Sequence, residues 1–248
     1  TFLAQGVSSI LATITLLRRV RQLETDEPVR YFDRGLLPSM ASVAVPSICQ
    51  QSFVSIGIFL VQGIINGLGA VTVAAFAAAL KISTFACTLI NTLPTALTSF
   101  ASQNIGAGRI DRAQEGLKCS IWIAEELILI INLIFFLFGG QLIGAFVNGA
   151  YQAEVIEQGT QFLRIVAPFY ALIGIKNSCD SVLRGGGVMG QFMATTFADL
   201  ALRVLFSYFF AKSLGFYSIC WAYPFGWIFG TLLSVVYYKM GRWKHIRI

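Results

Sequence analysis

Long runs of apolar residues, separated by short polar segments, make up most of the chain. Seven runs approach or exceed the length of about 20 residues that a helix needs to cross the hydrocarbon core of a bilayer. They cover roughly residues 1–17, 36–66, 70–100, 117–144, 158–184, 190–212 and 216–239. The apolar residues are continuous rather than alternating, so the pattern indicates helices and not the strands of a membrane barrel. We therefore predict an all-α membrane protein with seven transmembrane helices.

Prolines interrupt four of these runs. Pro46 lies near the start of the second run, Pro94 late in the third, Pro168 within the fifth and Pro224 within the seventh. A proline removes one backbone hydrogen bond and bends the helix. We expect kinks at these positions, which serve packing or act as functional hinges.

Basic residues gather in every second segment between the runs. Arginines follow the first run, Arg109 and Arg112 follow the third, Arg184 ends the fifth, and the tail 241–248 is basic. The intervening segments carry few charges, and the longest of them, 145–157, carries only two glutamates. Basic loops stay on the cytoplasmic side of a membrane. We predict that the first run starts outside the cell and that the chain ends in the cytoplasm.

The polar segment 18–35, with five basic and four acidic residues, divides the chain into unequal parts. We interpret 1–17 as a lone leading helix, 18–35 as a cytoplasmic linker, 36–240 as a six-helix unit and 241–248 as a cytoplasmic tail. The chain begins at Thr1 inside an apolar run, so we expect it to be part of a longer protein.

Composition agrees with a membrane location and narrows the chemistry. The 248 residues are 56% hydrophobic and 12% charged, whereas a soluble domain carries roughly a quarter charged residues. The net charge of +6 follows the loops, which favours membrane topology over a nucleic-acid partner. The one histidine, His245, lies in the tail, so no histidine is available for chemistry within the runs. We therefore expect no enzyme activity, no metal site and no cofactor.

Three short motifs occur in a recognisable order. The second run opens with LLPSMASVAVPSICQQS (36–52), the third leads into SQNIGAGRIDRA (102–113), and the fifth ends with SVLRGGG (181–187). In this order and at these positions they resemble the C-terminal lobe of the MATE family of multidrug and toxic compound extrusion transporters. The resemblance implies twelve helices in two bundles of six, the last helix of the N-terminal lobe over 1–17, and antiport of organic, often cationic, compounds against protons or sodium in the cell (inner or plasma) membrane.

The second and third motifs contain glycines next to arginines. Glycine permits tight turns, and amide side chains can cap helix ends. We interpret these residues as cytoplasmic structural turns: Gln103, Asn104, Gly106, Gly108, Arg109, Arg184 and Gly185.

Polar side chains inside the apolar runs are candidates for a substrate cavity or for ion coupling. Charged groups at membrane depth are costly and usually functional, and residues spaced i,i+4 share one helix face. That spacing joins Lys176 with Asp180 and Asp199 with Arg203, either as structural ion pairs or as coupling groups. The uncharged candidates link helices by hydrogen bonds or line a cavity. The full set is Gln50, Gln51, Asn66, Lys81, Asn91, Lys176, Asp180, Asp199 and Arg203.

Aromatic residues offer a further candidate surface. By position alone, Phe53, Phe59, Phe85, Phe169 and Tyr170 could form a wall for hydrophobic cations. The aromatics at 216–227 and Trp243 are more typical of an interfacial belt.

Ion coupling and substrate class stay open at this point. Some branches of the family carry coupling acids in the second and fifth runs, yet here the second run has no acid and Leu172–Gly174 is apolar. We expect coupling to protons or sodium through the N-terminal lobe. The alternative function is a flippase for lipid-linked oligosaccharides or polysaccharides, for which Lys81 and Lys176 would supply a cationic cavity; the QNIGAGR motif favours the MATE family.

Overall fold

The computed structural model describes residues 2–22, 34–147 and 151–244. The chain divides into two compact units, Thr1–Ala41 and Ser42–Ile248, each of which is described by itself. Most of the expected linker 18–35 and the end of the tail 241–248 lie outside the described residues. In the first unit, α1 (Phe2–Arg21) exposes the apolar side chains of residues 5–20, for example Ile10 and Leu16.

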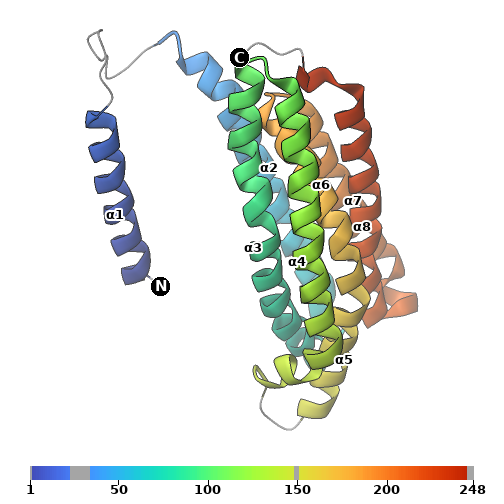
Figure 1. The fold of residues 1–248 in the computed structure, drawn as a ribbon. Helices are drawn as coiled ribbons and strands as arrows, with labels where there is room; N and C mark the ends of the chain where they lie inside the picture. Colours follow the sequence, from blue (N-terminus) through green and yellow to red (C-terminus); the bar gives the residue numbers. More distant parts are fainter. Residues whose placement is uncertain (1, 23–33, 148–150, 245–248) are drawn as a thin grey trace. The chain divides into compact units, whose positions relative to one another are not determined.

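The second unit is a bundle of long helices that run side by side (Figure 1). Its elements are α2 (Leu37–Asn66, from Ser42 onward), α3 (Ala70–Gly106), α4 (Ile110–Gly144), α5 (Gln152–Val166), a 3-10 turn (Ala167–Phe169), α6 (Tyr170–Gly185), α7 (Met189–Leu214), α8 (Phe216–Met240) and a final 3-10 turn (Arg242–Lys244). The predicted all-α fold is confirmed.

Five helices among the described residues are long and apolar enough to cross a membrane: α2 from Met40, α3, α4, α7 and α8. The predicted first and fifth spans are not among them. Arg18 and Arg19 lower the hydropathy of α1. The fifth span is two short helices, α5 and α6, because the chain forms a 3-10 turn at Pro168. The other prolines, Pro46, Pro94 and Pro224, lie inside continuous helices.

The turn between α3 and α4 needs a left-handed backbone at one glycine rather than at two. Helix α3 continues to Gly106, and only Gly108, with φ of 72°, has the left-handed backbone. The Arg109 amide donates to the Asn104 carbonyl (2.7 Å) and the Gly108 amide to the Ile105 carbonyl (2.9 Å). This is a Schellman cap, in which two amides satisfy the last free carbonyls of a helix.

The α6–α7 turn repeats this arrangement with Gly187, whose φ is 75°. The Val188 amide donates to the Leu183 carbonyl (2.9 Å). Gly185 is helical and has a different role: a Cβ at this position would lie 2.7 Å from the carbonyl oxygen of Thr98. The lack of a side chain therefore lets α6 approach α3.

Two of the aromatic residues that were expected in the interfacial belt are buried inside the second unit. Trp243 is fully buried, its ring stacks on Tyr238 at 5.3 Å, and its backbone lies against Gly186. Trp227 is also buried. The prediction was wrong for these two because the lobe folds them inward, where their large apolar rings fill the core.

Candidate functional site

A polar cavity of about 290 Å³ opens between α2, α3, α6 and α7. Polar and charged side chains dominate its lining, although the bundle around it is apolar. The lining residues are Gln50, Gln51, Asn91, Pro94, Thr95, Lys176, Asn177, Asp180, Ser181, Arg184, Phe192 and Thr196. We call this space the polar cavity.

Helix α6 supplies the charged part of the lining. Lys176, Asn177, Asp180, Ser181 and Arg184 follow the i, i+1, i+4, i+5, i+8 spacing of one helix face. Val182 lies on the opposite face of α6 and is buried in the apolar core. An amphipathic helix therefore turns its polar side toward the cavity.

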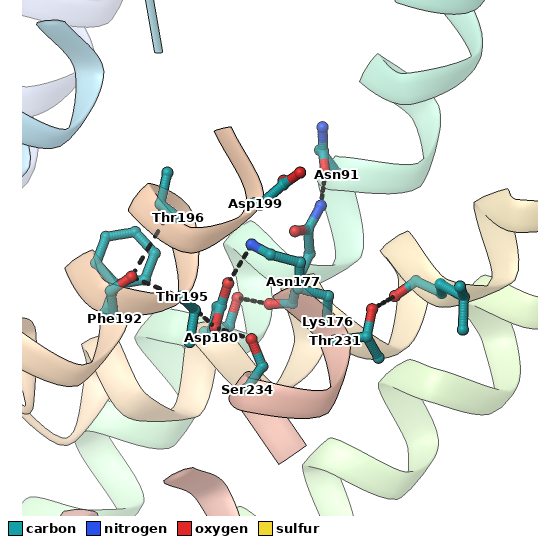
Figure 2. Close-up of polar contacts among 12 residues, drawn as sticks. Asn91, Lys176, Asn177, Asp180, Phe192, Thr195, Thr196, Asp199, Thr231 and Ser234 are labelled. Carbon is teal, nitrogen blue, oxygen red and sulfur yellow. Dashed lines mark hydrogen bonds and ion pairs between the residues drawn. The ribbon is translucent and has the colours of Figure 1, made fainter. Parts of the chain in front are cut away.

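Asp180 joins three helices (Figure 2). Its Oδ2 accepts a hydrogen bond from Lys176 Nζ at 2.7 Å, and its Oδ1 accepts from Ser234 Oγ (2.7 Å) on α8 and Thr195 Oγ1 (3.1 Å) on α7. The side chain is 5% exposed. A buried carboxylate is tolerated when it is paired and its oxygens accept hydrogen bonds, as here.

A second ion pair lies on α7, close to the pair of Lys176 and Asp180. Asp199 Oδ1 accepts from Arg203 Nη2 at 2.9 Å, both on α7. Gly230 of α8 connects the two pairs, because a Cβ there would lie 3.0 Å from Lys176 Cε and 3.1 Å from Asp199 Cβ. The two ion pairs predicted from spacing are thus both present, and Lys176 and Asp199 pack against the same glycine.

Two asparagines bridge α3 and α6 at the cavity wall. The amide of Asn177 donates to Asn91 Oδ1 (Figure 2). Asn91 and Thr95 lie one turn apart on the cavity face of α3. Gln50 and Gln51 face the same cavity from α2, whose contacts with α7 include the Phe53 and Phe197 rings at 4.4 Å.

Arg184 closes the end of the polar cavity near the α6–α7 turn. Its Nη2 donates to Thr98 Oγ1 at 2.9 Å, and its guanidinium lies 5.6 Å from the centroid of the Phe192 ring. Among the described residues, no carboxylate lies within ion-pair distance of this arginine. The residue predicted as a structural turn is therefore also part of the cavity.

A smaller cavity of about 230 Å³ adjoins the first. We call it the aromatic cavity, because Phe162, Tyr170, Tyr223 and Trp227 form its wall. Asn91 lines both cavities, and Thr84 and Thr88 continue the same face of α3. The remaining lining residues are Leu80, Ser83, Cys87 and Val166.

The other predicted residues lie elsewhere. Lys81 is exposed on α3 and lies outside both cavities, with its ammonium 5.6 Å from the centroid of the Phe146 ring. Asn66 ends α2 and accepts from Gln62 at 2.9 Å. Gln103 and Gly106 are exposed at the end of α3, and Asn104 donates to the Phe100 carbonyl at 2.8 Å. Neither Lys81 nor Asn66 contributes to the polar cavity.

The five aromatic residues predicted to form a wall do not lie together in one cavity. Of the five, only Tyr170 lines a described cavity, whereas Phe59 and Phe85 are at least 70% exposed. Sequence position could not separate inward from outward faces on helices that are apolar all round. Asn177 and Ser181 were missed although their spacing from Lys176 and Asp180 places them on the same face. Thr95, Phe192 and Thr196 had no such signal.

Metal binding has no obvious site in the part of the chain that the structure describes. No three side chains of histidine, cysteine, aspartate or glutamate lie together there.

Comparison with known proteins identifies the family of the chain. The profile of the MatE family matches residues 46–209. The chain is 25% identical over 250 residues to the probable multidrug resistance protein YpnP of Bacillus subtilis (strain 168), covering 100% of this chain and 55% of that protein. The chain therefore spans about half the length of the curated relatives it matches.

Solved transporters have the same fold. One of them is a MOP superfamily transporter from Pyrococcus furiosus, for which a reverse polarity of the binding pocket has been described. The match covers 96% of this chain and 54% of that transporter, with a TM-score of 0.86 and 22% identity. A MATE family transporter in the outward-facing conformation matches 88% of this chain and 49% of its own, with a TM-score of 0.79 and 22% identity. Because the family profile covers well over half of the chain and the fold is that of half a MATE transporter, this chain belongs to the MatE family of membrane transporters.

Proposed function

We propose that the chain is the C-terminal lobe of a two-lobe secondary transporter, which exports organic compounds from the cell in exchange for protons or sodium. The polar cavity is the observation that carries this proposal. Polar and charged side chains are costly inside a membrane bundle, and in transporters they mark substrate and ion paths. The names of the Bacillus subtilis relatives, probable multidrug resistance proteins, support export of several compounds.

A second lobe is part of the proposal. Helix α2 exposes a long apolar surface in the second unit, including Ile48, Ile56 and Phe59. Lipid and an N-terminal lobe of the same transporter would cover this surface. We assign 1–17 to the last helix of that lobe, 18–35 to the linker between the lobes, and 36–240 to the C-terminal lobe.

We place the end of the lobe that holds the α3–α4 and α6–α7 turns in the cytoplasm. These turns and the C-terminal segment pack together, because Ile105, Leu183, Val188 and Trp243 belong to one buried cluster. The same end carries the basic residues of the two turns and of the tail, which the positive-inside rule assigns to the cytoplasm.

Ion coupling is assigned to the other lobe. Asp180 is the only described carboxylate that lines either cavity, and its two oxygens already accept hydrogen bonds from three side chains. A coupling carboxylate has to exchange its proton or cation during each cycle. An acid with all its partners inside one lobe suits a structural role better.

Efflux of the full-length protein tests the proposal. The complete protein, expressed in a bacterial host that lacks its main drug efflux pumps, is expected to raise the inhibitory concentrations of several structurally different compounds. In proteoliposomes, an imposed pH gradient or an imposed sodium gradient should drive the transport of at least one of them. If no compound is exported under either gradient, the proposed function is wrong.

A flippase for lipid-linked saccharides is the second candidate, and the net positive charge of the polar cavity favours it. The lining contains Lys176 and Arg184 against the one carboxylate of Asp180. Lys81, the other cation expected in such a cavity, lies outside it. Flipping of a fluorescent lipid-linked saccharide by the full-length protein in vesicles, without any drug transport, would support this candidate.

A further inference from the structure

We infer that the polar cavity and the aromatic cavity together form one bipartite site for an amphipathic organic anion. The acidic group of the substrate, a carboxylate, sulfonate or phosphate, binds in the polar cavity, and its ring system binds in the aromatic cavity. This inference rests on the proposed function, because it names the substrate class of the same cavity. It differs from the cationic compounds that the family resemblance implies.

The charges that line the polar cavity set its preference. Lys176 and Arg184 outnumber Asp180, so the lining has one net positive charge. Asp180 uses Oδ2 for Lys176 and Oδ1 for Ser234 and Thr195. Its negative charge is therefore committed to the protein and is poorly placed to attract a cation.

Arg184 is the cation that stays available. Its hydrogen bond goes to the neutral hydroxyl of Thr98. A guanidinium carries five donors in a planar fork, which matches the oxygens of a carboxylate, sulfonate or phosphate. Asn91 adds a further donor, since its side-chain oxygen is the atom that accepts from Asn177 and its amide nitrogen has no hydrogen bond among the described residues.

The two cavities share one continuous wall. Thr84, Thr88, Asn91 and Thr95 recur every three or four residues and so lie along one face of α3. Asn91 belongs to both cavities. Sites for drug-sized ligands usually enclose about 300–1,000 Å³. The volumes of about 290 Å³ and 230 Å³ fall below this range separately and reach it together.

The aromatic wall is also poorly suited to a cation. The guanidinium of Arg203 lies 4.4 Å from the centroid of Tyr223 and 5.8 Å from that of Trp227. Cation–π attraction depends on the negative face of the ring. Because Arg203 already occupies this interaction at Tyr223 and Trp227, the rings serve an uncharged or anionic ring system better.

Two dyes with the same xanthene ring and opposite charge test the preference. Fluorescein is an anion at neutral pH, and tetramethylrhodamine methyl ester is a cation. With the purified full-length protein in nanodiscs, fluorescence anisotropy should give at least about tenfold tighter binding of fluorescein, the magnitude of one charge-assisted hydrogen bond. Equal affinity, or tighter binding of the cation, would overturn the inference.

Variants locate the acidic group. Arg184→Gln keeps a donor for Thr98 and should weaken fluorescein binding about tenfold. Arg112→Gln is the matched control: it removes an arginine that also lies over a phenylalanine, Phe100 at 6.0 Å, but lines neither cavity. Gln51→Glu, at an exposed position of the polar cavity, adds a negative charge without touching the core and should weaken fluorescein while strengthening the cation. Equal effects of the two arginine variants, or no effect of Gln51→Glu, contradict the inference.

A variant that fills the aromatic cavity tests where the ring system of the dye binds. Thr88→Phe places a ring in the aromatic cavity and should weaken fluorescein about tenfold, whereas Thr92→Phe, on the same helix but outside both cavities, should not. Efflux measurements separate a wrong substrate class from a wrong proposed function. Drug export that persists while these dye results fail would remove only the substrate class, and loss of all export would remove the proposed function itself.

Discussion

Asp180 illustrates how a charged residue is retained inside an apolar lobe. Three side chains from three helices donate to its oxygens, and Lys176 supplies the compensating charge. Breaking one partner of a buried pair leaves an uncompensated charge, whereas removing both partners is often close to neutral. The residue therefore stabilises the contact of α6 with α7 and α8.

Replacing Asp180 tests this role. Asp180→Asn should destabilise the full-length protein by about 3–5 kcal/mol, because Lys176 stays buried without its partner. The double variant Lys176→Met with Asp180→Asn should recover most of this loss. Thermal unfolding in detergent, followed for both variants and each single change, gives the comparison. A double variant that is as unstable as Asp180→Asn alone would contradict the pairing.

Gly185 is needed for close approach rather than for backbone freedom. A methyl group at this position would lie 2.7 Å from the Thr98 carbonyl and 3.1 Å from the Ser102 amide nitrogen, both backbone atoms of α3. Gly185→Ala should therefore cost about 1–3 kcal/mol. Gly106→Ala is the control, since Gly106 ends its helix with open space around it. Equal melting temperatures of the two variants would argue against the close contact.

At the scale of elements, the two glycine motifs form the same kind of helix-ending turn. Each ends a helix with a Schellman cap, so that two long helices reverse direction within three residues. Pro168 acts differently, because the 3-10 turn at this residue divides one predicted span into α5 and α6. The charged face of α6 then lies between α3 and α7, which makes the cavity.

The C-terminal segment is tied to the α6–α7 turn through Trp243. The indole donates its Nε1 proton to the Tyr238 carbonyl at 2.9 Å and is fully buried. Trp243→Ala should lower stability by about 3–5 kcal/mol, the usual cost of removing a buried large aromatic side chain. Trp122→Ala removes a tryptophan that is 71% exposed and should change stability little in the same melting experiment. A similar loss for both would show that the tail contact is weak.

At the scale of the whole molecule, the second unit exposes more apolar surface than is usual for a soluble protein. Large apolar residues of α2 and α4, such as Phe59 and Leu129, are more than 70% exposed. Monomeric soluble proteins rarely show such extended apolar surfaces. In the function that we propose, lipid and a second lobe cover these residues, and the distribution of basic residues supports the proposed orientation.

Labelling in intact cells tests that orientation. Arg109→Cys lies on the proposed cytoplasmic end and Glu154→Cys on the opposite end, and both residues are exposed. In a background with Cys49→Ala and Cys119→Ala, a membrane-impermeant maleimide should label only the Glu154→Cys protein. Permeabilised cells provide the control, in which both positions react. Labelling of Arg109→Cys in intact cells would reverse the topology.

The sequence by itself determined the all-α class, the family and most of the helices in their order, but not the division of the fifth run into α5 and α6. Apolar runs of membrane length and the alternating basic loops are local properties, since lipid demands that each helix satisfies its own backbone. The i,i+4 spacing was likewise enough to pair Lys176 with Asp180 and Asp199 with Arg203. Only the tertiary structure decided which side chains meet. Helices that are apolar on every face carry no inward mark, so nothing in the sequence excluded Lys81 from the polar cavity or placed Tyr223 and Trp227 in the aromatic wall.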